Sequence, residues 1–233
     1  MDAQSVELPH HLATLPLFSA MSATELQRLA AGCQLRHLQA EEMVFHVGQR
    51  CQEFHVNLSG QIKLFALSPA GQEKVIELLG PGHSFAEALM FTDRPYIISA
   101  QALTDTLLLT VPKAIVLAEI AHDAQFALRM LAGVSRRLHG LLQDVEAYSL
   151  HSGLERIIGY LLRDQDLAQG GRSEAVTVPL PVSKATIASR LSLTPEYFSR
   201  VLHELATAGL IDVGRREIVI RDARRLAAYR PAD

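Results

Sequence analysis

The sequence predicts an α+β fold in three parts: an N-terminal antiparallel β-roll of the jelly-roll kind, one long helix, and a C-terminal winged helix-turn-helix. Short apolar runs separated by glycines occupy residues 41–111, an apolar heptad runs through residues 124–150, and two short amphipathic helices with a hairpin follow residue 182. We therefore expect a β-roll domain over residues 1–123, the long helix over 124–150 and the winged helix-turn-helix over 151–233.

Length and composition are those of a globular protein with a large core. The chain has 233 residues, of which 48% are hydrophobic, and a chain of this length commonly forms two domains. No stretch suits a membrane span or a signal peptide, so we expect a cytoplasmic protein without a membrane partner. The formal net charge is −3, but residues from 151 onward hold 12 Lys or Arg against 10 Asp or Glu, while the first 150 hold 10 against 15. The C-terminal part is therefore the one suited to a polyanion such as DNA.

The N-terminal part begins with a predicted helix over residues 17–38. Ser22 is placed to cap this helix, and Glu25 three residues later completes a capping box. Strands follow, because short runs rich in β-branched and aromatic residues are broken by glycines at regular distances. We expect an antiparallel roll that encloses an inner pocket. The expected strands are 43–45, 54–58, 61–65, 74–79, 97–100 and 106–109.

The helical period that begins after Pro112 becomes a heptad over residues 124–150. Apolar residues recur there at spacings of three and four for nearly four repeats, which predicts a helix about 40 Å long. Such a stripe is either a core face of the same domain or the seam of a dimer, and its length and its place between two domains favour the dimer. The predicted seam includes Ala124, Ala127 and Tyr148, and its central contacts are Leu131, Val134, Leu138, Leu141 and Val145.

A short helix over residues 154–162, a polar loop and a strand over 176–180 precede the helix-turn-helix. Ser183 can cap the first of its two helices, and Pro195 suits the first position of the second helix, directly after the capping residue Thr194. The second helix carries a buried stripe at i, i+3, i+4 and i+7. The stripe consists of Phe198, Val201, Leu202 and Leu205. Two β-runs flank Gly214-Arg215-Arg216 and predict a hairpin with a basic tip, which is the wing.

Polar side chains occupy a different face of the second helix, namely Glu196, Ser199 and Arg200. In the major groove Arg pairs with guanine, Glu accepts from the cytosine amino group and Ser can serve either way. A Glu and an Arg four residues apart also form ordinary helix ion pairs, but the turn and the wing favour the reading of DNA bases. Contacts with the DNA backbone are expected from Ser183, Lys184, Thr194, Arg215 and Arg216.

The order of β-roll, long helix and winged helix-turn-helix resembles the cyclic AMP receptor protein and fumarate-nitrate reductase regulator superfamily of bacterial transcription factors. The resemblance covers essentially the whole chain. The runs GQEKVIEL at 71–78, FAEALMF at 85–91 and PEYFSRVLHEL at 195–205 are similar to the dissimilatory nitrate respiration regulator branch. The resemblance implies a cyclic-nucleotide-binding-like roll that senses an effector, a homodimer, and RNA polymerase as a partner. It also implies that Glu196, Ser199 and Arg200 read a palindrome of TTGAT-type half-sites.

Cyclic AMP is not the expected effector, because the residues that hold it in this family are replaced. Relatives that bind cyclic nucleotides place an Arg and a Ser or Thr about ten residues after the Glu of their phosphate cassette, whereas counting from Glu87 gives Ile97 and Ile98. Arg94 is three residues out of register, and Ala86 replaces the usual Gly. A phosphate without its bidentate Arg would be poorly held. Leu141 and Leu142 replace the adenine-contacting pair, so the expected pocket residues are Phe85, Glu87, Ile97, Ile98, Leu141 and Leu142.

An apolar pocket beside a Leu-rich helix suits haem, and the nitrate respiration branch is associated with haem-mediated nitric oxide sensing. The candidate ligands are His10 and His11 on the N-terminal arm and His139 on the long helix, although a surface or capping role is the alternative for each. The chain has two cysteines, Cys33 and Cys51, which are too few for an iron–sulfur cluster. We expect them to be buried structural thiols rather than a redox pair.

Three alternatives to a haem-dependent regulator remain open. The first is a cupin-like metal enzyme, which needs clustered His and Glu, whereas His46, His55 and His83 are single. No nucleophile-elbow, P-loop or H-E-x-x-H pattern occurs either, so we expect no enzyme. The second is a regulator activated by a cyclic nucleotide or another small molecule. The third is a constitutive regulator whose pocket is vestigial.

Overall fold

The computed structural model describes residues 8–9, 12–13, 18, 21–163 and 175–230. The chain forms two compact units, residues 1–141 and 142–233, so the division between them falls inside one long helix. The predicted α+β fold class is confirmed, because the first unit is an antiparallel β-roll and the second combines a small sheet with a helix-turn-helix. Among the described residues, no helix is both long and apolar enough to cross a membrane.

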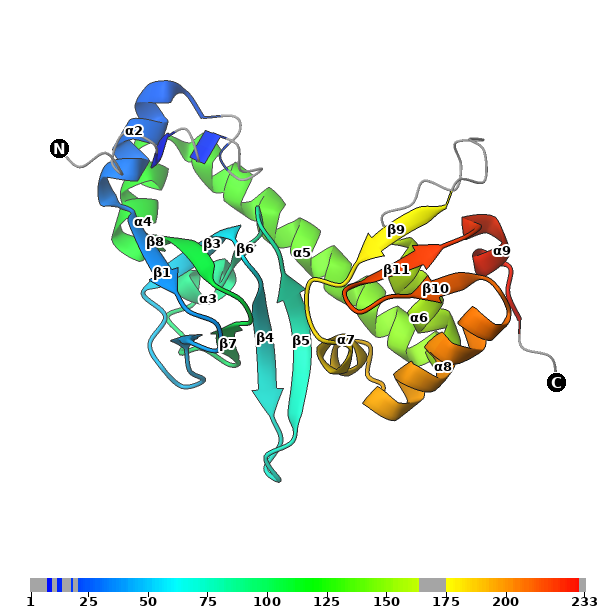
Figure 1. Ribbon diagram of the computed structural model, residues 1–233. Helices are drawn as coiled ribbons and strands as arrows, with labels where there is room; N and C mark the ends of the chain where they lie inside the picture. Colours follow the sequence, from blue (N-terminus) through cyan, green and yellow to red (C-terminus); the bar gives the residue numbers. More distant parts are fainter. Residues whose placement is uncertain (1–7, 10–11, 14–17, 19–20, 164–174, 231–233) are drawn as a thin grey trace. The chain divides into compact units, whose positions relative to one another are not determined.

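The β-roll consists of two four-stranded antiparallel sheets (Figure 1). Its strands are β1 (Gln34–Leu38), β2 (Met43–Phe45), β3 (Glu53–Ser59), β4 (Ile62–Leu67), β5 (Glu73–Leu79), β6 (Ser84–Phe85), β7 (Ser99–Ala102) and β8 (Thr106–Pro112). One sheet has the order β1-β8-β3-β6 and the other the order β2-β7-β4-β5. Each of the six strands predicted for the roll overlaps one of these eight, while β1 and β6 were not predicted.

An aromatic cluster lies in the core of the roll. Phe45 stacks on Tyr96 with ring centroids 3.6 Å apart, and Phe85 lies 6.1 Å from Phe45. His55 is buried beside them, 5.2 Å from the Phe85 ring, and its Nδ1 lies 3.2 Å from the Thr110 hydroxyl. Burial lowers the pKa of His55 to about 3, because desolvation disfavours the charged imidazolium. The imidazole is therefore a neutral member of the core.

The first helix ends earlier than the sequence suggests. α2 (Ala23–Gly32) begins after Ser22, whose hydroxyl accepts from the Glu25 N–H while the Glu25 carboxylate accepts from the Ser22 N–H, so the predicted capping box is confirmed. Residues 34–38, predicted as the end of this helix, form β1 instead and pair with residues 106–110 of β8. This pairing satisfies their backbone groups, and such a tertiary contact overrides a local helical preference.

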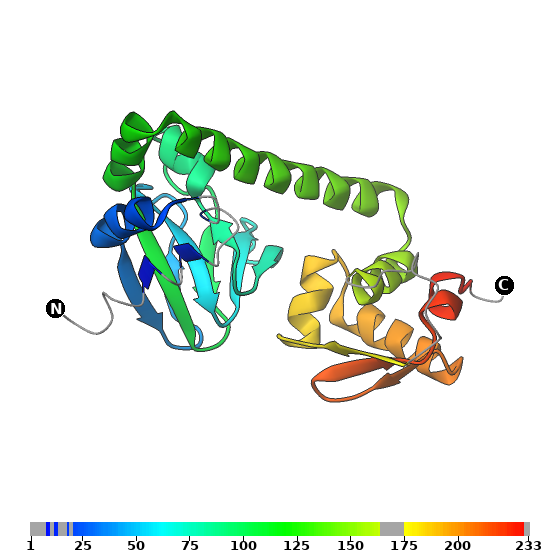
Figure 2. The same ribbon diagram turned by 90° about the horizontal axis from the view of Figure 1, so that it is seen from above.

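The helical region after Pro112 is broken into two helices. α4 (Lys113–His122) ends at Asp123, which has an extended backbone and whose carboxylate accepts from the Gln125 N–H at 2.9 Å. The long helix α5 (Ala124–Leu150) then runs for 27 residues, as predicted, and Figure 2 shows it along its length. A short helix that was not predicted, α3 (Glu87–Phe91), follows β6 in the roll.

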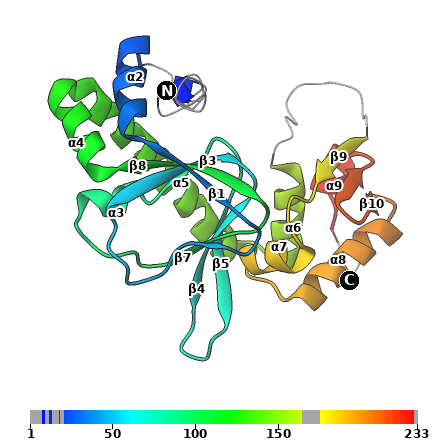
Figure 3. The same ribbon diagram turned by 60° about the vertical axis from the view of Figure 1, so that its left-hand side comes forward.

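The second unit is built around the buried stripe of one helix. Its elements are the end of α5, α6 (Gly153–Leu162), β9 (Val176–Pro179), α7 (Lys184–Arg190), α8 (Pro195–Thr207), β10 (Ile211–Val213), β11 (Glu217–Ile220) and α9 (Ala223–Ala227). The sheet has the antiparallel order β10-β11-β9, and Figure 3 shows its strands and the helices of this unit. The stripe residues of α8 are all buried, as their spacing predicted: Phe198, Val201, Leu202 and Leu205.

Candidate DNA-binding and effector sites

The helix-turn-helix has the caps that the sequence predicts. The Ser183 hydroxyl accepts from a backbone N–H in the first turn of α7, and the Thr194 hydroxyl does the same for α8. Pro195 occupies the first position of α8. Between the two helices Ser192 adopts φ 57°, a left-handed conformation that few residues other than Gly adopt without strain. These local features place α8 directly after a tight turn.

The three side chains predicted to read DNA bases share an exposed face of α8. Glu196, Ser199 and Arg200 are exposed, whereas Phe198 is fully buried on the opposite side. The Arg200 guanidinium lies over the ring of Tyr197, 5.0 Å from its centroid. A guanidinium stacked in this way is held by its flat face. Its edge, which is the part that pairs with guanine, remains available.

Tyr197 is a supporting residue that the sequence reasoning missed. Its ring lies against the start of α6, where a Cβ added at Gly153 would come within 2.5 Å of Tyr197 Cε1. Glycine at this position therefore lets the ring approach the α6 backbone closely, and the ring in turn supports Arg200. The signal in the sequence was the spacing of three between Tyr197 and Arg200, which places two side chains on one side of a helix.

The residues expected to contact the DNA backbone come from α7, the cap of α8 and the wing. Lys184 is half-buried, and its ammonium donates to the carbonyl of Gly214 at 3.3 Å, which connects α7 to the wing tip. The other four side chains are exposed: Ser183, Thr194, Arg215 and Arg216.

The first unit contains an apolar cavity of about 430 Å³ between strands of the roll, α3 and α5. This volume lies within the range of small-molecule sites. Glu87, Ile97, Ile98 and Leu141, four of the expected pocket residues, line the cavity. The fifth, Phe85, is buried in the core of the roll. The sixth, Leu142, is exposed on α5 rather than in the lining.

One charged cluster borders this cavity. Arg137 of α5 donates to Glu77 Oε2 at 2.6 Å and to the Ser84 carbonyl at 2.7 Å, and its Nη1 lies 3.7 Å from Glu87 Oε2. The Ser84 hydroxyl also donates to Glu87 at 2.5 Å. With two carboxylates against one guanidinium, this wall disfavours an anion at close range. The sequence did not reveal the cluster, because its members are up to 60 positions apart.

The two positions expected to hold a cyclic phosphate, by resemblance to the family, are Ile97 and Ile98, and neither carries a charge. In the described lining the one cationic side chain is Arg137, and its hydrogen bonds go to Glu77 and Ser84. Arg94 is exposed outside the lining. Ala86, where relatives carry Gly, has φ 73°, so this alanine adopts a conformation that favours glycine.

The apolar stripe of α5 divides between two faces. Val134 and Leu141, which the sequence placed on the dimer seam, line the cavity, and Leu141 is also 37% exposed. Leu138 borders the cavity while 58% exposed. Tyr148, also expected on the seam, is half-buried, and its hydroxyl donates to the Arg190 carbonyl at 2.6 Å. The large exposed side chains at heptad spacing are Leu128, Leu131, Leu138, Leu142 and Val145.

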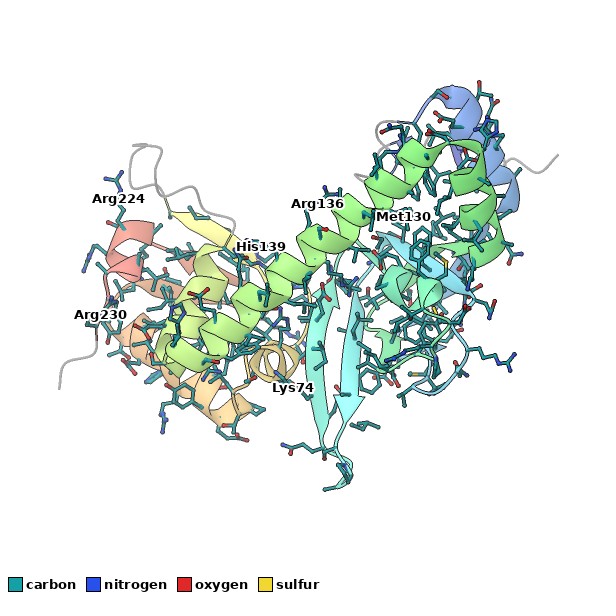
Figure 4. All side chains as sticks on the ribbon, turned by 180° about the vertical axis from the view of Figure 1, so that it is seen from behind. Lys74, Met130, Arg136, His139, Arg224 and Arg230 are labelled. Atoms are coloured by element: carbon teal, nitrogen blue, oxygen red, sulfur yellow. The ribbon has the colours of Figure 1, made fainter. Side chains whose placement is uncertain are left out.

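None of the candidate haem ligands belongs to the described lining of the cavity. His10 and His11 lie outside the described residues. His139 lies on the middle of α5 (Figure 4) and is exposed outside the cavity lining. No His, Cys, Met or Tyr side chain occurs in the described lining. Nor do three His, Cys, Asp or Glu side chains gather as a possible metal site anywhere in the described part of the chain.

The two cysteines are free thiols, Cys51 buried and Cys33 partly buried. Burial raises the pKa of Cys33 to about 12, so this thiol stays protonated and unreactive at neutral pH. Burial also raises the pKa of Cys51. Both residues thus have the character of structural thiols.

Both parts of the chain match known protein families. Residues 35–123 match the Cyclic nucleotide-binding domain, and residues 155–229 match the Crp-like helix-turn-helix domain. The chain therefore belongs to the cyclic AMP receptor protein and fumarate-nitrate reductase regulator family of DNA-binding transcription regulators, and it is not an enzyme.

Similar proteins occur in several bacteria. The Cyclic AMP receptor protein of Thermus thermophilus is 28% identical over 212 residues, which cover 91% of this chain and 94% of that protein. DNR from Pseudomonas aeruginosa, whose crystal structure is known, is 35% identical in sequence to this chain. The two structures match with a TM-score of 0.52, and the match covers 99% of this chain and 100% of the DNR chain. FixK2 from Bradyrhizobium japonicum is 24% identical with a TM-score of 0.74, covering 86% and 98%, and shares the fold.

Proposed function

We propose that the protein is a homodimeric regulator that binds a palindromic promoter site with TTGAT-type half-sites. The observation that carries this proposal is the exposed face formed by Glu196, Ser199 and Arg200 on a capped helix whose other face is buried. Recognition helices enter the major groove with their N-terminal residues, and these side chains suit guanine and cytosine edges. RNA polymerase is the protein partner that we propose for such a regulator.

The substitution Arg200→Ala tests the reading of bases. A bidentate contact between Arg and guanine contributes about 1–3 kcal/mol of discrimination, so affinity for the cognate palindrome should fall about tenfold or more and the choice of base at that position should relax. Fluorescence anisotropy with palindromes that carry each base pair at each half-site position measures both effects. Arg216→Ala on the wing is the control, because a phosphate contact should weaken binding to all sequences alike and reduce its salt dependence. A sequence-blind loss in Arg200→Ala would contradict the proposal.

Dimerisation through α5 is part of the proposal. Leu131, Leu142 and Val145 are each about 60% exposed and follow heptad positions along one helix. Solvated apolar stripes of this length are typical of coiled-coil seams that a second copy covers. Two copies joined in this way would present two α8 helices, which is what a palindrome requires.

The effector is proposed to be an apolar molecule rather than cyclic AMP, because the cavity walls are apolar and Arg137 is already bound to protein groups. Haem, with nitric oxide as its signal, is the candidate that the resemblance to the nitrate respiration branch favours. The apolar walls suit the macrocycle. When bound, haem would supply an iron that takes a diatomic gas.

The described residues fit the macrocycle better than they fit the iron. The described lining offers no side chain of the usual axial types, and the Glu77 and Glu87 carboxylates oppose the acidic propionates. We therefore propose that an iron ligand comes from His10 or His11. Two alternatives to haem remain in this proposal, namely an apolar effector without iron and a constitutive regulator without an effector. The geometry of the cavity favours both of them over a regulator that binds a cyclic nucleotide.

A further inference from the structure

The last turns of α5 hold the end of α7 through a cluster of polar side chains. Asp144 and Tyr148 are four residues apart, so they share one side of α5, and both contact Arg190, the last residue of α7. The Asp144 carboxylate lies 2.5 Å from Arg190 Nη2. The Tyr148 hydroxyl accepts from Arg190 Nη1 and donates to the Arg190 carbonyl at 2.6 Å. One arginine thus joins the two helices by three contacts.

Arg156 of α6 makes a second connection to the same turn. Its Nη1 donates to the Leu191 carbonyl at 2.8 Å and reaches the Ser192 carbonyl at 3.5 Å. Its guanidinium also lies 5.9 Å from the centroid of the Tyr148 ring. Carbonyl groups at a helix end lack partners within the helix. Arg156 therefore stabilises the turn that leads from α7 to α8.

The Arg190 cluster is better shielded than an ordinary surface ion pair. The side chains of Arg190 and Asp144 are 17% and 32% exposed, whereas those of Arg221 and Asp212, an ion pair elsewhere in the same unit, are 55% and 54% exposed. Charge-assisted hydrogen bonds are stronger where water competes less. Burial also raises the pKa of Tyr148, so its hydroxyl keeps the proton that it donates.

We infer that Asp144, Tyr148 and Arg190 form a latch that sets the direction of the recognition helix α8 relative to the end of α5. Arg190 ends α7, and the turn that follows it leads directly into α8. The division of the chain agrees, because residues 142–150 of α5 group with the DNA-binding unit. In a dimer joined through α5, this direction determines the separation of the two recognition helices and hence the half-site spacing that is accepted. The inference rests on the proposed dimeric DNA binding and names the residues that position it.

The test measures spacing preference rather than affinity alone. Arg190→Ala removes the latch, and Tyr148→Phe removes only one hydroxyl. Each full-length variant is titrated with palindromes at the preferred spacing, with palindromes whose half-sites are moved by one or two base pairs, and with a single half-site. The measured quantity is the affinity for the palindrome at the preferred spacing divided by the affinity for the palindrome with shifted half-sites. This ratio should fall about tenfold in Arg190→Ala, which corresponds to the loss of one charge-assisted hydrogen bond, and by less in Tyr148→Phe. Affinity for the single half-site and the choice of bases should stay unchanged.

Arg221→Ala is the matched control, because it breaks a two-bond pair with Asp212 in the same unit and should leave the spacing ratio unchanged. Circular dichroism melts show whether each variant folds, and if Arg190→Ala does not, Tyr148→Phe decides. An unchanged ratio in the folded latch variants would overturn the inference. An equal loss of affinity for the palindromes at every spacing and for the single half-site would also overturn it, because a merely structural role would produce that result. A wild-type protein that does not distinguish the palindrome from scrambled DNA would overturn the proposed function, and the latch with it.

Discussion

His55 shows how one residue of the roll makes folding depend on pH. Its imidazole is 1% exposed and is held neutral, since burial lowers its pKa from 6.5 to about 3. In the unfolded chain the same side chain takes up a proton once the pH falls below about 6.5. The unfolded state then binds more protons than the folded state, so the stability that His55 contributes is present above that pH and is lost as the pH falls toward 3.

We predict that His55→Gln flattens the pH dependence of unfolding. Glutamine keeps a polar group beside Thr110 but does not titrate, so the wild-type protein should lose up to about 1.4 kcal/mol more per pH unit than the variant once the pH is below about 6.5. Urea unfolding followed by circular dichroism between about pH 7.5 and 5.5 measures the difference. The range stops there because burial raises the pKa of the nearby Glu53, whose effect has the opposite sign. Parallel curves for the two proteins would mean that His55 is protonated inside the fold.

At the scale of elements, the local sequence predicted the helix caps of the DNA-binding unit but not which face of α5 is covered. The caps at Ser183 and Thr194 were predicted because a cap depends on neighbours three residues away. The face of α5 was harder, because Leu131-Val134-Leu138 and Leu131-Ser135-Leu138 both satisfy spacings of three and four. Which face is covered depends on the roll, whose residues are distant in sequence. Long-range partners such as Arg137 with Glu77 leave no local pattern at all.

The exposed stripe of α5 gives a prediction about assembly. Leu142→Glu places a charge on the seam without touching the cavity, because Leu142 is 59% exposed and lies outside the lining. A buried unpaired charge is costly in a dimer interface, so this variant should sediment as a monomer and bind the palindrome at least about tenfold more weakly.

Gln143→Glu adds the same charge to α5 at an exposed position that does not belong to the seam, and it should remain dimeric. If Leu142→Glu sediments with the mass of the wild-type protein, the interface lies on another surface.

At the scale of the whole molecule, regulation requires an effector that binds two states of the protein with different affinity. Val134, Leu138 and Leu141 of α5 border the cavity, and the same helix continues to Asp144 and Tyr148 of the latch. An occupant that moves these three side chains therefore acts on the helix that also carries the latch. Continuity alone does not demonstrate coupling, so the effector has to be tested by its effect on DNA binding.

The haem proposal makes the final prediction, which concerns both the ligand and the signal. Purified apo-protein titrated with haemin should develop a Soret band that saturates at one haem per chain. The band should change or vanish in the double variant His10→Ala and His11→Ala. The control His139→Ala should keep it, because His139 lies outside the cavity lining. Nitric oxide should then change the affinity of the haem-loaded protein for the palindrome by about 5–150-fold, the usual size of allosteric coupling.

Two results would rule haem out: haemin that binds without a defined ratio to the protein, or an affinity for DNA that nitric oxide does not change. The apolar walls and the occupied Arg137 would then point to an uncharged apolar effector that needs no metal.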